Sequence, residues 1–345
     1  MENLTNIQNS QVLLDFGIQA NEAAARAVFA LYQERRPINT QRSQRAALGL
    51  FSEFVQSAGI EVSDLYSSPT AWQGISWGLV QAFQQWLIQN GYSMKTVNDR
   101  VSVIKVYMSL ANQAGIIPDS EILKLQSIRG YTRKEAKDAD AKREAEGIAT
   151  RMGAKKSTAT IITDEQAKAL CQASGDSPQA RRDALLMSLL LDHGLRVGEV
   201  TLLKIEDIDR SQHQITFYRP KTGMTSCHNL RGRAWNCLIE YLAKDNHTDR
   251  GILILASHKT GALIPGKGMT IRAINDRVRK LGMVAGLKNL SPHDCRHYGA
   301  TKAGNDPSVS LAGLMSWGGW ASPQSAAHYI NRGEADNNGV HLGLE

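Results

Sequence analysis

The sequence lacks the features that would hold a protein in a membrane or cross-link it with disulfide bonds. Its 345 residues include only four cysteines and no CxxC pair, the four being Cys171, Cys227, Cys237 and Cys295. This spacing favours free, reduced thiols, as in cytosolic proteins. No run of about 18 apolar residues is present, and the N-terminus shows no basic region followed by an apolar core. We therefore expect a cytoplasmic protein without a membrane partner.

The charge of the chain points to a polyanionic partner. The formal net charge is +7 and the isoelectric point lies near 9.2. Residues 1–130 hold 10 basic and 10 acidic side chains, so the whole excess lies in residues 131–345. The hydrophobic content of 42% is enough for packed cores and excludes a globally disordered chain. The length favours two domains.

The first half of the chain shows helical patterns and no convincing strand. Residues 1–20 are polar with scattered apolar residues, and we expect a flexible N-terminus there. Asn21 suits the N-cap of a helix that stops before Pro37, and Thr40 suits one that stops at Gly59. Apolar stripes predict further helices over about 76–90, 95–114 and 120–129. Residues 21–130 are thus predicted to form a compact all-α domain.

Several basic residues in and after this domain are candidates for contacts with phosphate groups. In the domain they are Arg42, Arg45, Lys95, Arg100 and Lys105, although a solvated helix face explains each of them equally well. Lys95 is the best of these because it opens a helix, where backbone N–H groups also favour an anion. Residues 131–158 alternate charges, and we expect a basic interdomain linker that is helical first and then extended. Its Lys155 and Lys156 are further candidates.

Residues 159–330 are predicted to form a second domain, and residues 331–345 a tail rich in glycine and asparagine. Helices are expected over 164–173, 181–193, 199–205, 270–285 and 291–304, around Leu311 and at Tyr329. Strands are expected over 214–218, 226–230 and 252–255. The domain is therefore predicted to be mainly α, in the α+β class, with a small antiparallel sheet.

Two stretches of this domain carry positively charged residues in special settings. Arg196 follows the glycine turn that ends a buried helix, and Glu199 is placed to brace it. Taken alone, Arg196 is as well explained by a surface salt bridge to Glu199. Lys221 lies in the Pro220–Gly223 turn of a predicted hairpin, where its ammonium can reach into a groove. Taken alone, it is as well explained as a solvated turn lysine.

The stretch that holds most of the remaining candidate site residues lies between residues 291 and 329. Ser291-Pro292 suits a helix start, and His293, Arg296 and His297 share one face of that helix. A metal site at the two histidines is disfavoured because the HExxH glutamate and an evident third ligand are missing. The Gly318-Gly319-Trp320 box and Tyr329 follow.

Arg196, Lys221, His293-x-x-Arg296, Trp320 and Tyr329, in this order, resemble the tyrosine recombinases of the phage-integrase family. The Gly-Gly-Trp box is similar to the form found in Cre recombinase. The resemblance is strongest over about residues 160–330. For residues 21–130 it rests on the number and position of the helices, which match the all-α core-binding (SAM-like) domain of the family.

The resemblance implies a mechanism for this set of residues. Tyr329 would attack the scissile phosphate and form a 3′-phosphotyrosyl link with a free 5′-hydroxyl. Arg196 and Arg296 would bind the non-bridging oxygens, and Lys221 would protonate the leaving oxygen. His293 would bond the phosphate or accept the tyrosine proton.

The remaining site residues would support this chemistry. Trp320 would donate its indole N–H to the phosphate and pack the segment of Tyr329, whereas Glu199 and His297 would brace their neighbours. Two arginines and a lysine supply the charge and the covalent link stores the bond energy, so we expect no metal and no other cofactor. The implied partner is double-stranded DNA with inverted-repeat recognition sites. A homotetramer would form on two paired sites from a monomer in solution, associated with the nucleoid.

Two alternatives stay open at this point. A type IB topoisomerase-like nicking-closing enzyme shares the chemistry but needs one protomer only. A sequence-specific DNA-binding protein that has lost catalysis would share the fold. The presence of all the expected side chains disfavours the second alternative.

Overall fold

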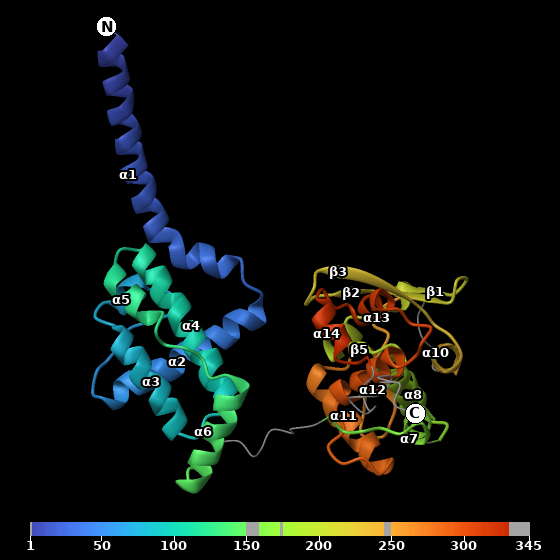
Figure 1. Cartoon of the computed structure of the whole chain (residues 1–345). Coiled ribbons are helices and arrows are strands. Elements are labelled where there is room, and N and C mark those ends of the chain that lie inside the picture. The colour runs from blue at the N-terminus through green and yellow to red at the C-terminus, as the bar shows by residue number, and fades with distance from the viewer. Residues whose placement is uncertain (1, 150–158, 173–174, 245–249, 331–345) are drawn as a thin grey trace, which may run out of the picture. The chain divides into compact units, whose positions relative to one another are not determined.

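The computed structural model describes residues 2–149, 159–172, 175–244 and 250–330, which fall into two compact units (Figure 1). Unit 1 ends at Lys155 and unit 2 begins at Lys156. In the part of the chain that is described, no helix is long and apolar enough to cross a membrane. Lys155, Lys156 and the predicted tail over 331–345 lie outside the described residues.

Unit 1 is built from helices alone within its described residues. Its elements are α1 (Glu2–Glu34), α2 (Ile38–Ser57), the 3₁₀ helix η1 (Pro69–Trp72), α3 (Trp77–Gln89), α4 (Met94–Gln113), α5 (Asp119–Leu125) and α6 (Arg133–Ala145). Ser76 and Ser93 cap α3 and α4 by accepting a hydrogen bond from a first-turn backbone N–H. The centre of the core of unit 1 is formed by four fully buried aromatic residues, Phe51, Trp72, Phe83 and Tyr107.

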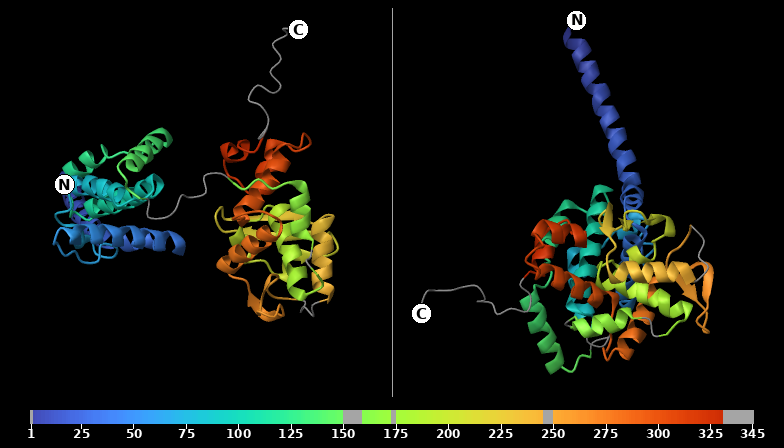
Figure 2. Two further views of the ribbon diagram at one scale, coloured as in Figure 1. Left: turned by 90° about the horizontal axis from the view of Figure 1, so that it is seen from below. Right: turned by 90° about the vertical axis from the view of Figure 1, so that its right-hand side faces the viewer.

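The first helix begins earlier than the sequence pattern predicts. Asn21 lies inside α1 rather than at its start, and residues 2–20, assigned above to a flexible N-terminus, form its first part. No proline interrupts residues 2–34, and Gly17 is their one glycine, so backbone geometry allows one continuous helix. Its N-terminal part extends beyond the other helices of unit 1 (Figures 1 and 2).

The helical part of the predicted linker packs on unit 1. The α6 helix starts with a capping box between Thr132 and Glu135. Its Arg143 is only 4% exposed and donates a hydrogen bond of 2.6 Å to the backbone carbonyl of Tyr92. The helix expected in the first part of the linker over 131–158 is therefore present as α6, and it packs on unit 1 because the aliphatic part of Arg143 is buried while its guanidinium binds a carbonyl oxygen.

Unit 2 surrounds the long buried helix α8 with helices and two small sheets (Figure 2). Its elements are α7 (Asp164–Cys171), α8 (Pro178–Leu191), α9 (Val197–Val200), η2 (Ile205–Asp207), β1 (Ile208–Asp209), β2 (Gln214–Arg219), β3 (Met224–Asn229), α10 (Arg233–Lys244), β4 (Leu255–Ser257), β5 (Leu263–Gly268), α11 (Ile271–Val284), α12 (Pro292–Gly304), α13 (Leu311–Gly318) and α14 (Pro323–Ala327). One sheet has the antiparallel order β1-β2-β3, and the other pairs β4 with β5.

The fold class predicted from the sequence is confirmed, with differences at single elements. The predicted strand over 252–255 is shifted, since β4 starts at Leu255 and Ile252 forms an isolated bridge with Lys204. The helix predicted over 199–205 is instead the short α9 followed by η2. Two elements, α10 and β5, were not predicted, although α10 carries apolar residues at helical spacing, with Ala234, Leu238 and Tyr241 buried.

Candidate active site

The first arginine of the site is placed by a turn that only glycine can form. Gly194 follows α8 with a φ of +57°, and a Cβ there would lie 2.2 Å from the ring of Trp317. Arg196 comes next and is about one-quarter exposed, at 24%. Its guanidinium donates to Glu199 Oε1 at 2.9 Å and lies 3.5 Å from the carbonyl oxygen of Gly319. Glu199 thus holds Arg196, as predicted.

The second arginine comes from α12 and is almost fully buried. Ser291 and Asp294 start this helix with a capping box, and Pro292 stands in its first turn. Arg296 is 3% exposed and donates to the carbonyl oxygens of Gly194 and Gly318. Burial, followed by the charge of Arg196, lowers the pKa of Arg296 to about 10, so it still carries its charge at neutral pH.

Three ring systems continue the site beside this arginine. The Arg296 guanidinium lies 4.7 Å from the centre of the Trp320 ring. The Trp320 ring stacks on the Tyr329 ring at 5.2 Å between centroids. His297 lies 5.2 Å from Tyr329 and its Nε2 is 3.1 Å from Nε2 of His293. The predicted site residues Arg296, Trp320, Tyr329 and His297 therefore contact one another in succession, in that order.

His293 and Lys221 lie on the open side of the site. Both side chains are exposed, and Lys221 occupies the turn between β2 and β3, as predicted. Partial burial lowers the pKa of His293, with smaller contributions in the same direction from Arg296, Arg196 and Lys221. His293 is therefore neutral at pH 7. Lys221 is close enough for its charge to contribute to the lowered pKa of His293.

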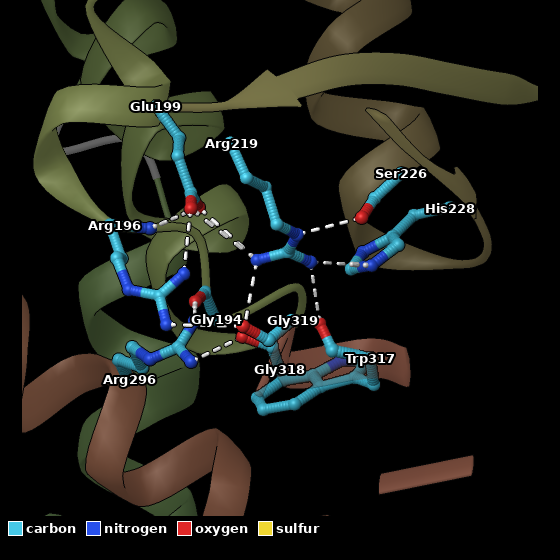
Figure 3. A network of polar contacts seen from close by, with 10 residues as sticks. All are labelled: Gly194, Arg196, Glu199, Arg219, Ser226, His228, Arg296, Trp317, Gly318 and Gly319. Carbon is cyan, nitrogen blue, oxygen red and sulfur yellow. Dashed lines mark hydrogen bonds and ion pairs between the residues drawn. The ribbon is translucent and has the colours of Figure 1, made fainter. Parts of the chain in front are cut away.

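A fully buried third arginine joins these parts, and the sequence analysis did not single it out. Arg219 is 0% exposed and contacts Glu199 at 3.3 Å and the carbonyl oxygen of Trp317 at 2.7 Å (Figure 3). A signal was available in the sequence. With period two, Ile215, Phe217 and Arg219 face the same side of β2, and that side is buried.

The glycines of the Gly-Gly-Trp box are explained by this arginine cluster, which we define as Arg196, Arg219 and Arg296. The carbonyl oxygens of residues 317–319 accept hydrogen bonds from its members. Gly319 has a φ of +58°, and a Cβ there would lie 2.4 Å from Cδ of Arg219. A Cβ at Gly318 would lie 2.0 Å from the Trp320 ring. Arg196 and Arg219 pair with Glu199, whereas Arg296 binds backbone carbonyl oxygens, so a phosphate beside Arg196 and Arg296 would balance the charge of the site.

The basic residues predicted to contact phosphate lie on two neighbouring helices of unit 1. Arg42 and Arg45 are on α2, and Lys95, Arg100 and Lys105 are on α4. Three of them bind groups of the protein, since Lys95 pairs with Asp99 and Arg100 and Lys105 donate to the carbonyl oxygens of Ser43 and Ile128. Arg45 stacks on the Tyr66 ring at 3.7 Å. Among the described residues, no group of three or more His, Cys, Asp or Glu side chains could hold a metal ion.

Comparison with known proteins shows the family of the chain. Residues 160–335 match the model of the phage integrase family, which is half of the chain, and the chain belongs to that family of tyrosine recombinases. It is similar to the tyrosine recombinase XerC of Roseiflexus sp. (strain RS-1), with 23% identity over 268 residues, 75% of this chain and 72% of the relative. XerC of Chlamydia trachomatis serovar D is 27% identical over 217 residues, 62% of this chain and 60% of the relative.

Solved structures of the same fold include a transposon integrase and lambda integrase. The Tn1549 transposon integrase in complex with circular intermediate DNA has a TM-score of 0.61 and 14% identity, covering 93% of this chain and 99% of that one. A lambda integrase dimer bound to a core site has a TM-score of 0.60 and 16% identity, covering 90% and 95%. At these identities the likeness concerns the fold.

Proposed function

We propose that this protein is a site-specific recombinase that cuts and rejoins double-stranded DNA through a covalent bond to Tyr329. The observation that carries the proposal is the meeting of Arg196, Arg296, Trp320 and Tyr329 at one site, although they come from separate stretches of the chain. Membership of the phage integrase family supports it. The DNA in the solved lambda and Tn1549 structures supports the choice of substrate.

The proposed reaction is a transesterification in which the number of phosphate esters is conserved. The Tyr329 oxygen attacks phosphorus, a P–O bond to tyrosine forms, and the bond from phosphorus to the 5′-oxygen breaks. The tyrosine proton passes to neutral His293, and Lys221 gives a proton to the leaving 5′-oxygen. Attack by a 5′-hydroxyl of the partner strand reverses these steps and releases Tyr329.

The arginines stabilise the charge that develops on phosphorus oxygens. Arg296 has little contact with solvent, so its field is weakly screened where the transition state forms. Arg196 keeps part of its guanidinium exposed and is the arginine that a phosphate reaches first. Trp320 donates its indole N–H to the same phosphate and orients the Tyr329 ring, while Glu199 and His297 hold their neighbours in place.

The assembly we propose uses both units on each DNA site. Unit 1 contacts the duplex with Arg42, Arg45, Lys95, Arg100 and Lys105, and Lys155 and Lys156 of the connecting segment add charge. Two protomers bind an inverted repeat, and four protomers pair two sites. The reaction uses no metal and no other cofactor, because the charges that it needs come from Arg196, Arg296 and Lys221.

Covalent trapping tests this function. We would incubate the protein with labelled duplexes from the neighbourhood of its gene and from a random-sequence pool, some of them nicked beside the cleavage site. Wild-type protein should give an adduct that survives denaturing electrophoresis, whereas Tyr329→Phe should bind the same DNA without an adduct. Cleavage by Tyr329→Phe would show that another residue is the nucleophile. Tight binding by both without any adduct would favour the DNA-binding protein that has lost catalysis.

A further inference from the structure

Arg219 makes polar contacts with five residues of unit 2 (Figure 3). Its Nε donates to Ser226 Oγ at 2.7 Å, and one terminal nitrogen lies 3.3 Å from Glu199 Oε2. The guanidinium also reaches the carbonyl oxygens of Trp317 at 2.7 Å and Gly318 at 3.3 Å. The contact with His228 Nε2 is 3.3 Å. At 0% exposure, Arg219 has no path to a bound phosphate and acts through its neighbours.

The backbone of the same residue closes the turn that carries Lys221. The carbonyl oxygen of Arg219 accepts hydrogen bonds from the backbone N–H of Thr222 at 3.1 Å and of Gly223 at 2.9 Å. Arg219 also pairs with Met224 as the last pair of β2 and β3. Lys221 is thus only two residues from Arg219, whose backbone is held by these bonds, while the Lys221 side chain itself is exposed.

The far end of the Arg219 side chain is bound to the segment that holds the rest of the site. Residues 317–319 also accept from Arg196 and Arg296 and lead directly into Trp320. Gly319 leaves room for the aliphatic part of Arg219, since any Cβ there would lie 2.4 Å from its Cδ. The side chain therefore links the base of the Lys221 turn to the arginines across the site.

We propose that Arg219 is a positioning residue that sets the place of Lys221 relative to the scissile phosphate. The inference rests on the proposed function and deepens it. Because β2 is fixed at Arg219, movement of Lys221 is limited to that of its own four-residue turn. Loss of this anchor leaves the arginines in place on α12 and beside Glu199, but it lets the general acid drift from the leaving oxygen.

A substituted DNA separates this role from a general structural role. An alkoxide leaving group needs a proton, since the pKa of water is about 15.7. A thiol has a pKa of about 8.5 and leaves as the thiolate without one. In a duplex with sulfur in place of the 5′-bridging oxygen, the Tyr329 oxygen bonds to phosphorus, the P–S bond breaks, and its electrons stay on sulfur. A defect in proton donation disappears with that duplex, and a defect in binding phosphate persists.

The experiment compares both duplexes, built on the sequence that Tyr329→Phe retains from a random pool. Wild type, Lys221→Ala, Arg219→Lys and the control Arg272→Lys, whose side chain is 93% exposed, are assayed for adduct formation. Arg219→Lys keeps the charge but cannot reach all five partners. We expect Arg219→Lys and Lys221→Ala to react on the order of 10²-fold more slowly with the oxygen duplex. Both should react within about threefold of wild type with the sulfur duplex.

Three outcomes would overturn the proposal while leaving the recombinase function intact. Equal slowing of Arg219→Lys on both duplexes would mean that Arg219 supports phosphate binding by the arginines, or the fold, rather than proton donation. An unchanged rate on both would remove its role. If Arg219→Lys melts well below wild type, Ser226→Ala, which removes only the Nε bond, decides instead: a smaller defect restored by sulfur supports the proposal, and none contradicts it. Absence of any wild-type adduct would contradict the proposed function itself.

Discussion

Burial of charge distinguishes the residues of the candidate site from ordinary surface arginines. Arg196 and Arg219 pair with Glu199, and Arg296 donates to the backbone carbonyl oxygens of Gly194 and Gly318. Such groups carry a desolvation cost that an arriving phosphate offsets. The cluster is therefore better suited to binding an anion than to stabilising the free protein.

The arginines should be needed for cleavage more than for folding. Arg196→Ala and Arg296→Ala should each lower the rate of adduct formation by on the order of 10²- to 10³-fold, because each removes donors from the charged transition state. The rate is measured on the selected duplex, with Arg272→Ala as the control. A loss below tenfold for either variant would count against its role in the transition state.

His293 should give the cleavage rate a dependence on acid pH. Its pKa is lowered by partial burial and by nearby positive charges, so it lies below the ordinary value of 6.5. The neutral ring accepts a proton, and the rate should rise as pH increases through this lowered pKa and level off before neutrality. Rates between pH 5 and 8 check this, and His293→Gln should remove the rise. A rise that persists unchanged in His293→Gln would show that another group accepts the proton.

At the scale of elements, the site depends on how closely α12 packs on α8. Gly299 lies on α12 one turn after Cys295, on the face towards α8, and a Cβ there would lie 2.2 Å from the backbone oxygen of Leu191. A backbone atom cannot move aside as a flexible side chain would. This contact keeps Arg296 within reach of the Gly194 carbonyl at the end of α8.

Gly299→Ala should therefore destabilise the protein although alanine is the better helix former. We expect a loss of about 1–3 kcal/mol in the free energy of unfolding from overpacking. Gly49→Ala in α2, where a Cβ meets nothing within 4 Å, should instead stabilise by about 0.5–1 kcal/mol. Denaturant unfolding measures both. Equal effects of the two substitutions would mean that α12 can move away from α8 at little cost.

At the scale of the whole molecule, the proposed reaction requires several copies of the chain. A single protomer has one Tyr329 and cuts one strand, so exchange between two duplexes needs four. The arginines, His293, Trp320 and Tyr329 all come from unit 2 of the same chain. We therefore expect cleavage to need one protomer and the pairing of sites to need contacts between copies.

Mass measurement in solution tests this arrangement. The free protein should have the monomer mass of 37.9 kDa. With duplexes that carry the full inverted repeat, a complex of four protomers and two duplexes should form. Duplexes with a single half-site should bind one protomer. One protomer per full site, together with relaxation of supercoiled DNA, would favour the topoisomerase-like alternative.

The sequence by itself determined the fold class and the family, and it predicted the residues that would carry the chemistry. Helix caps such as Ser93 and Thr163 and apolar periodicity are local signals, so they are readable along the chain. The order of Arg196, Lys221, Arg296 and Tyr329 gave the family before any coordinates. The role of each of these residues stays a prediction that the experiments above address.

The tertiary structure decided those features of the protein that depend on residues far apart in the sequence. The packing of α6 on unit 1 depends on contacts with distant residues, such as the Tyr92 carbonyl that binds Arg143. Arg219 follows the predicted strand over 214–218, and nothing near it in the sequence indicates its partners at residues 317–319, about 98 positions away. Long-range hydrogen bonds of this kind leave no periodic trace in the sequence, because their two ends are brought together only by folding.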